Sequence, residues 1–174
     1  MNTAKLAIAV RVEESRDSEG VRTVNEKAFG RPNEASLVDA LRGLPHSISL
    51  VASARERIVG HILFTPLQIE GSPKEVVASG LGPMAVLPEC QRQGVGSQLV
   101  RAGLDSCRAS RHDAVVVIGH PEFYPRFGFV PAATKGLRCE FDVPPDVFMV
   151  LELRIGALGS RGFVKYRPEF SALE

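Results

Sequence analysis

Residues 84–99 read Met84-Ala-Val-Leu-Pro-Glu-Cys-Gln-Arg-Gln-Gly-Val-Gly-Ser-Gln-Leu99, a stretch in which a predicted strand ends, a glycine-bearing loop follows and a helix begins. Gly94 and Gly96 leave this turn without Cβ atoms, so backbone N–H groups can point at an anion with the helix dipole behind them. Arg92 adds a positive charge at the same turn. The stretch predicts a phosphate-binding turn. The alternative is a tight strand-to-helix turn, in which glycine is common for conformational reasons alone.

The turn departs from two widespread nucleotide-binding patterns. No Gly-Lys-[Ser/Thr] sequence occurs in the chain, which excludes a Walker A loop. Leu99 stands where the third glycine of a dinucleotide fingerprint would be, so an NAD enzyme of Rossmann type is a poor fit. The sequence therefore indicates a nucleotide cofactor of another kind.

Hydrophobic periodicity predicts an alternation of strands and helices around this turn. The predicted strands cover residues 6–13, 48–54, 58–69, 76–86, 114–118, 147–153 and 163–166. The predicted helices cover residues 17–29, 33–43, 95–110 and 121–127, with Asn33 as an N-cap. A turn is expected at Gly71-Ser-Pro73. This order predicts an α/β fold with one mixed sheet and helices on both of its faces.

Composition narrows the class of protein. A chain of 174 residues with 44% hydrophobic and 24% charged residues is typical of one globular domain, here 1–174. Lys+Arg number 21 and Asp+Glu number 20, with the signs interspersed, so we expect no nucleic-acid partner and no membrane partner. Cys90, Cys107 and Cys139 lack C-x-x-C spacing, so we expect neither a metal site nor disulfides, and a cytoplasmic location.

The hexapeptide Gln91-Arg-Gln-Gly-Val-Gly96 resembles the pyrophosphate loop of the GCN5-related N-acetyltransferase (GNAT) family, whose pattern is Gln/Arg-x-x-Gly-x-Gly/Ala. The segment 80–132 is similar to small bacterial predicted acetyltransferases of the YhbS type. The resemblance covers residues 1–131 as the family core and leaves 132–174 as C-terminal strands, which shape either the acceptor site or a homodimer contact. It implies the family's fold, in which two central parallel strands splay apart.

In the family, acetyl-CoA lies in the gap between those strands, here between the strand ending at Val86 and the strand 114–118. The residues themselves support a bulge or a break there, because Pro83 offers no N–H to a ladder and Gly80 and Gly82 weaken local pairing. The resemblance places the pantetheine arm on the backbone of Met84, Ala85 and Val86, and lets an N–H of Met84 or Ala85 polarise the thioester carbonyl. It places the pyrophosphate on Gln91, Arg92, Gln93, Gly94, Val95, Gly96, Ser97 and Gln98.

A second motif, Tyr124-Pro-Arg-Phe-Gly-Phe129, resembles the family signature Tyr-x-x-Phe-Gly-Phe. In the family this tyrosine lies near the CoA sulfur, so the resemblance makes Tyr124 the general acid that protonates the leaving thiolate. The alternative is a tyrosine whose ring packs at the edge of the core.

No general base is evident on the strand that leads to the cofactor, because Gly80, Leu81, Gly82 and Pro83 cannot take a proton. The remaining candidates are water and the side chains of Glu34, His61, His120 and Glu122. Cys90 is expected to be inert, since no histidine lies beside it in the sequence, although a Ping-Pong mechanism through it stays open.

The resemblance implies an acetyl-CoA-dependent N-acetyltransferase that acts by direct attack of a small-molecule amine on the thioester. A different class of protein is also compatible with these residues, a non-catalytic acyl-CoA-binding sensor or regulatory domain. The missing base is the observation that favours this alternative.

Overall fold

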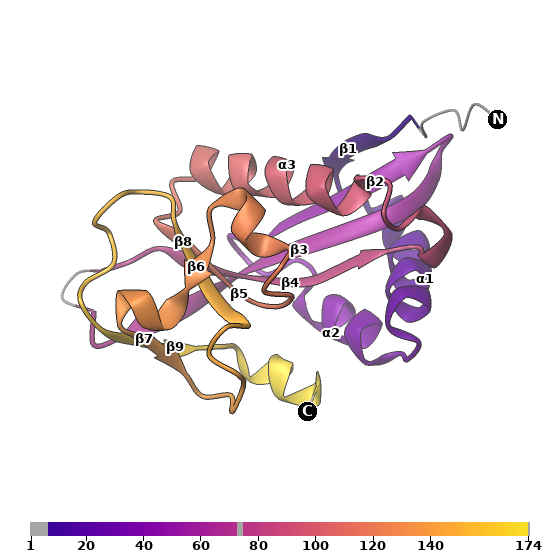
Figure 1. Ribbon diagram of the computed structural model, residues 1–174. Coiled ribbons are helices and arrows are strands. Elements are labelled where there is room, and N and C mark those ends of the chain that lie inside the picture. The colour runs from indigo at the N-terminus through magenta and orange to yellow at the C-terminus, as the bar shows by residue number, and fades with distance from the viewer. Residues whose placement is uncertain (1–6, 73–74, 174) are drawn as a thin grey trace.

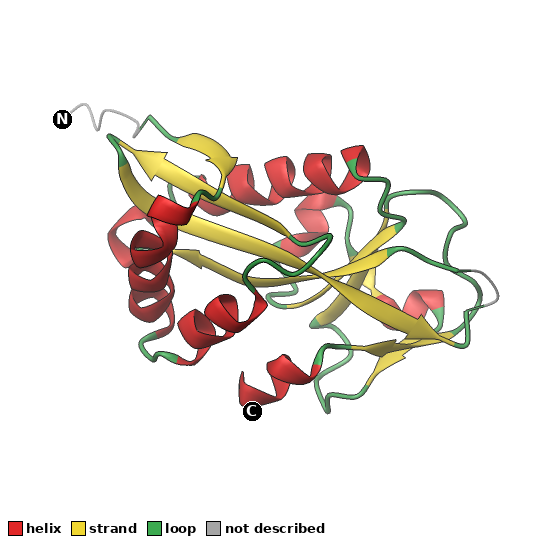
Figure 2. Ribbon diagram, turned by 180° about the vertical axis from the view of Figure 1, so that it is seen from behind, coloured by secondary structure: helices red, strands yellow, loops and turns green. Residues whose placement is uncertain are grey.

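An open mixed sheet runs through the molecule, and helices cover both of its faces (Figures 1 and 2). This computed structural model describes residues 7–72 and 75–173, so Leu6 of the first predicted strand and Pro73 of the predicted turn lie outside the described residues. The predicted α/β class with helices on both faces is confirmed.

The helices differ in which face of the sheet they cover. α3 (Val95–Ala109) packs on one face, and α1 (Ser18–Phe29) and α2 (Asn33–Leu41) pack on the other. The apolar side chains of α3 lie at helical spacing, and Leu99, Val100 and Leu104 are buried against the sheet.

The strands of the main sheet follow the order β1-β2-β3-β4-β5-β8-β6. They are β1 (Ala9–Val12), β2 (Ile48–Ala54), β3 (Arg57–Glu70), β4 (Ala78–Val86), β5 (Ala114–Ile118), β8 (Phe148–Glu152) and β6 (Val130–Pro131). β4 and β5 run parallel, and the other neighbours in this order run antiparallel.

The C-terminal part of the chain is built into the same sheet. β8 pairs with β5, and β9 (Gly162–Lys165) pairs with the end of β3 through Gln68–Glu70 and with β7 (Leu137–Cys139). The chain then ends in a 3-10 helix, Pro168–Leu173, which lies beside α2 (Figure 2).

β5 shows why a continuous apolar run forms a central strand. Val115 and Val117 belong to one hydrophobic cluster, while Ala114 and Val116 belong to a second cluster on the opposite side of the strand. All four side chains are almost fully buried, as the sequence predicted for a strand covered on both faces.

Several predicted boundaries are wrong. Asn33 is the first residue of α2 and Pro32 holds the N-cap position, so Asn33 does not cap the helix. The predicted helix 121–127 is a 3-10 helix limited to Tyr124–Phe127. β6 and β7 were not expected, because strands of two and three residues arise from pairing with distant partners and leave no periodicity in the sequence.

The described residues contain no helix long and apolar enough to cross a membrane. Cys90, Cys107 and Cys139 all carry free thiols.

Contact between α3 and the sheet depends on a glycine. A Cβ at Gly103 would lie 2.2 Å from Cε2 of Phe64, whose side chain is fully buried. The helix therefore approaches β3 more closely than any other residue at this position would allow.

We expect Gly103→Ala to lower the free energy of unfolding by about 1–3 kcal/mol, because the buried Phe64 ring must shift. Helix propensity alone predicts the opposite sign, a gain of about 1 kcal/mol. Urea denaturation decides between these outcomes, and a stabilised variant would show that the close contact is unimportant. Asp105→Ala on the exposed face of α3 is the control, with an expected change within about 0.5 kcal/mol.

Candidate functional site

A gap opens in the middle of the sheet where β4 and β5 stop pairing. Their parallel ladder ends at Leu81 and Val117, but β4 continues to Val86 with β3 as its only strand partner among the described residues. Splayed central strands, which the resemblance to the GNAT family implied, are therefore present.

A bulge accompanies the separation of the two strands. Between the pairs Ile62–Met84 and Phe64–Leu81, β4 contains one residue more than β3. Gly82 supplies the left-handed backbone that this bulge requires, with a φ of +147°. The strand is bent and continuous here, whereas the sequence left open whether it would break.

The backbone of β4 presents hydrogen-bonding groups to the gap. The N–H of Leu87 donates to the carbonyl of Val59 at 2.9 Å, which fixes the alternation of the antiparallel ladder between β3 and β4. By that alternation Ala85 is bonded to His61 on β3, and Met84 and Val86 turn their backbone groups toward the gap. Of the two amides expected to polarise a thioester carbonyl, only that of Met84 faces the gap.

The end of α3 borders the same gap. Gly94 occupies the N-cap position with a φ of +84°, and the first helical hydrogen bond runs from the N–H of Gln98 to the carbonyl of Gly94, at 3.1 Å. The N–H groups of Val95, Gly96 and Ser97 precede that bond, so the helix itself offers them no acceptor. This is the geometry of an anion-binding helix N-terminus.

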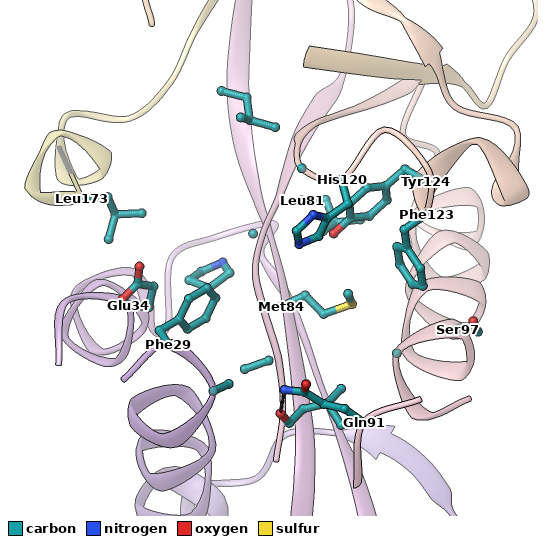
Figure 3. Close-up of a pocket in the computed structure, with 18 of the residues that line it drawn as sticks. Phe29, Glu34, Leu81, Met84, Gln91, Ser97, His120, Phe123, Tyr124 and Leu173 are labelled. Carbon is teal, nitrogen blue, oxygen red and sulfur yellow. Dashed lines mark hydrogen bonds between the residues drawn. The ribbon is translucent and has the colours of Figure 1, made fainter. Parts of the chain in front are cut away.

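A cavity of about 1180 Å³ lies along both sides of β4 (Figure 3). Among the residues expected to bind the cofactor, the cavity is lined by Met84, Ala85, Val86, Gln91, Arg92, Gly94, Gly96 and Ser97.

Three expected residues, Gln93, Val95 and Gln98, do not line the cavity. Gln93 donates its side-chain amide to the carbonyl of Glu89 at 2.9 Å, and the side chain of Val95 belongs to the core. In the loop, Gln91 donates its side-chain amide to the carbonyl of Val86 at 3.0 Å and thereby connects the loop to the open strand edge.

Tyr124 lines the cavity from the turn that follows β5. Its ring lies against Gly119, where a Cβ would be 2.4 Å from Cε2, and packs edge-on to Phe123 and Phe129. Burial raises the pKa of the Tyr124 phenol well above its usual range, because the ionised form would lose its hydration. A phenol that stays protonated can donate a proton and cannot serve as a base near neutral pH.

The four side chains considered as bases separate into two pairs. Glu34 and His120 line the cavity from opposite sides (Figure 3), whereas His61 and Glu122 do not line it. Glu34 is almost fully buried, and Arg31 donates from Nε to both of its carboxylate oxygens at 3.1 Å. His120 and Glu122 are exposed.

His61 belongs instead to a buried polar cluster between the sheet and α1. Its Nε2 lies 2.9 Å from Oγ of Ser49, which donates to Glu13, and its Nδ1 lies 3.3 Å from Nδ2 of Asn25. An amide nitrogen only donates, so Nδ1 of His61 accepts and Nε2 carries the proton. Burial raises the pKa of Glu13, but hydrogen bonds with His61 and Ser49 outweigh burial and lower it to about 2. Since Nε2 cannot accept the serine proton, this cluster is structural.

One wall of the cavity was not predicted from the sequence. It comes from the part of the chain that was expected to shape either an acceptor site or a dimer contact, and consists of Phe141, Asp142, Val143, Tyr166, Phe170 and Leu173. No motif marks these residues, because only the pairing of β9 with β3 brings them to β4. Cys90 also lines the cavity and is buried.

Comparison with known proteins places this geometry in a family. Residues 9–132 match the family model described as an acetyltransferase (GNAT) domain. The uncharacterized N-acetyltransferase YhbS of Escherichia coli (strain K12) is 36% identical over 165 residues, which cover 93% of this chain and 98% of that protein. The uncharacterized N-acetyltransferase YjhQ of the same strain is 37% identical over 134 residues, covering 75% of this chain and 74% of that protein.

Two crystal structures have the same fold. The GNAT family N-acetyltransferase YhbS from Escherichia coli in complex with CoA superimposes with a TM-score of 0.89 at 34% identity, covering 98% of this chain and 96% of the other. A GNAT family acetyltransferase from Brucella melitensis in complex with acetyl-CoA gives a TM-score of 0.76 at 32% identity, covering 94% of this chain and 98% of the other. The splayed strands, the glycine turn and the extent of these similarities together show that the chain is a member of the GNAT family of N-acetyltransferases.

Proposed function

We propose that this enzyme transfers the acetyl group of acetyl-CoA to the amine of a small acceptor by direct attack on the thioester. One observation carries the proposal: the open edge of β4, the free N-terminus of α3 and Tyr124 border a single cavity. The similar proteins crystallised with CoA and with acetyl-CoA support the choice of cosubstrate.

The cavity residues fit an extended ligand with a phosphate group at one end. Backbone groups of Met84 and Val86 would bind an amide-containing arm as a neighbouring strand would. The N–H groups of Gly96 and Ser97, with the exposed guanidinium of Arg92, would bind the pyrophosphate. The unpaired backbone groups of β4 thus match the amides of the pantetheine arm, and the unpaired N–H groups of α3 match the pyrophosphate of CoA.

Acetyl-CoA supplies the activated acetyl thioester. The N–H of Met84 would donate to the carbonyl oxygen as it gains charge, which is the role of an oxyanion-hole donor. Tyr124 would donate its proton to the leaving sulfur, a role that its raised pKa permits. His120, Glu34 or water would accept the amine proton, since these side chains line the cavity and the other two considered do not.

The relatives named as N-acetyltransferases favour a catalyst over a non-catalytic acyl-CoA sensor. We also propose a reducing location such as the cytoplasm, which agrees with the three free thiols.

Substitutions at Gly96 test the pyrophosphate site. A Cβ at this position would meet Met84 and Phe123 at an ordinary 3.6 Å, so the fold accepts alanine, while a longer side chain extends into the cavity. We expect Gly96→Leu to weaken CoA binding by about 10- to 100-fold through loss of charge-assisted hydrogen bonds, and Gly96→Ala to weaken it less. Calorimetry measures both affinities, with thermal unfolding as the control for folding. Equal binding by Gly96→Leu and the parent protein would contradict the assignment.

Tyr124→Phe tests the acid step. Loss of a general acid lowers kcat by about 10²- to 10⁴-fold, whereas the affinity for CoA should stay unchanged because the ring is retained. Steady-state kinetics and calorimetry on the same preparation separate these quantities. An unchanged kcat would assign Tyr124 to packing alone.

The pH dependence of kcat gives a further test of Tyr124. The neutral phenol is the active form, and a raised pKa keeps it neutral as the pH rises, so kcat should not fall up to about pH 10. A contrary result would be a kcat of the parent enzyme that falls with rising pH below about pH 10 while kcat of Tyr124→Phe does not. It would show that burial does not keep the phenol of Tyr124 protonated.

A further inference from the structure

The cavity extends beyond the proposed cofactor site to the opposite side of β4. Figure 3 shows Glu34, Phe29 and Leu173 on that side, across β4 and Met84 from Tyr124, Phe123 and Ser97. Residues from α1, α2, the segment 141–143 and the C-terminal 3-10 helix form its walls together with Tyr166. We call this side the acceptor arm.

The walls of the acceptor arm are largely aromatic. Tyr166 lies between Phe141 and Phe170, with ring centroids 5.2 Å and 5.4 Å away. Its ring also lies over β4, where a Cβ on Gly80 would be 3.2 Å from Cε1 of Tyr166. Phe29 lines the cavity from the end of α1 with 42% of its surface exposed. Such walls favour a ligand with a flat apolar body.

The charged residues of the cavity separate by sign. Arg92 lines it next to α3, where the phosphates of CoA would lie, and Arg126 lines it in the turn after β5, with its guanidinium over the ring of Phe123. The acceptor arm contains the carboxylates of Glu34 and Asp142 and no cation among its lining residues within the described parts of the chain. Arg31 compensates the charge of Glu34 from outside the lining, so exposed Asp142 supplies the net negative charge.

We propose that the acceptor is a small primary amine carried on an apolar, aromatic body without a carboxylate, bound in the acceptor arm with its N–H groups donating to Asp142. This inference rests on the proposed function and adds the chemical class of the acceptor. A primary ammonium group has three N–H donors and matches the carboxylate of Asp142, which only accepts. A carboxylate on the acceptor would lie near the carboxylate of Asp142, and no cation among the described lining residues of the acceptor arm would pair with it. Repulsion between the two carboxylates would therefore disfavour binding of such an acceptor.

Binding of amines to the CoA-saturated protein tests the class without requiring turnover. Calorimetry with phenethylamine, phenylalanine, ethylamine and spermidine compares an aryl amine with the same body plus a carboxylate, with an amine lacking the ring, and with a polycation. We expect phenethylamine to bind at least about tenfold more tightly than each of the others. Equal or tighter binding of any of the other three, or no binding of phenethylamine, would overturn the inference.

Two aspartates in one loop provide a matched pair of variants. Asp142 lines the cavity and Asp146 does not, and both are exposed, so neither Asp142→Asn nor Asp146→Asn should affect folding. We expect Asp142→Asn to weaken phenethylamine binding about threefold and Asp146→Asn to leave it unchanged. Identical affinities of the two variants would exclude a role for Asp142.

Release of free thiol from acetyl-CoA in the presence of phenethylamine tests the proposed function separately. Selective binding without any acetyl transfer would contradict the proposed function while supporting the ligand class. Turnover of all four amines with equal kcat/KM would contradict the ligand class while supporting the proposed function.

Discussion

The separation of β4 from β5 beyond Leu81 is the constraint on which the site depends. A parallel sheet normally uses every backbone N–H and carbonyl, so two central strands that part leave groups that another molecule must bind or water must solvate. The bulge at Gly82 turns β4 away from β5 while β3 continues to pair with it on the other side. The free edge is therefore held rigidly, and a ligand that binds there need not order the strand first.

The elements around the open edge of β4 position the other parts of the site. The turn at Gly94 directs the N-terminus of α3 to one end of the gap, and the close contact between Gly103 and Phe64 fixes the distance of this helix from the sheet. β8 pairs with the far side of β5, so the strand that leaves β4 is still supported. The proposed chemistry then needs few side chains, because most of the proposed contacts to the cofactor come from the backbone.

The sequence was most informative where local geometry and chemistry coincide. Gly94 and Gly96 predicted the turn before α3, and the apolar run 114–118 predicted a buried central strand. The acceptor arm could not be predicted, because Tyr166 and Phe141 reach β4 only through pairing between β9 and β3, and their positions follow no periodicity. His61 was considered as a base, but the sequence could not show the direction of its side chain. It lies on the strand next to β4, and its side chain points into a buried cluster with Ser49.

Hydrogen exchange at individual amides of β4, followed by NMR with and without CoA, tests the central claim most directly. If CoA binds along the open edge, the amides of Met84 and Val86 become protected, while that of Ala85, already bonded within the sheet, changes little. Unchanged exchange at Met84 and Val86 in the presence of saturating CoA would contradict the account, because the ligand would then not use the edge that the splayed strands expose.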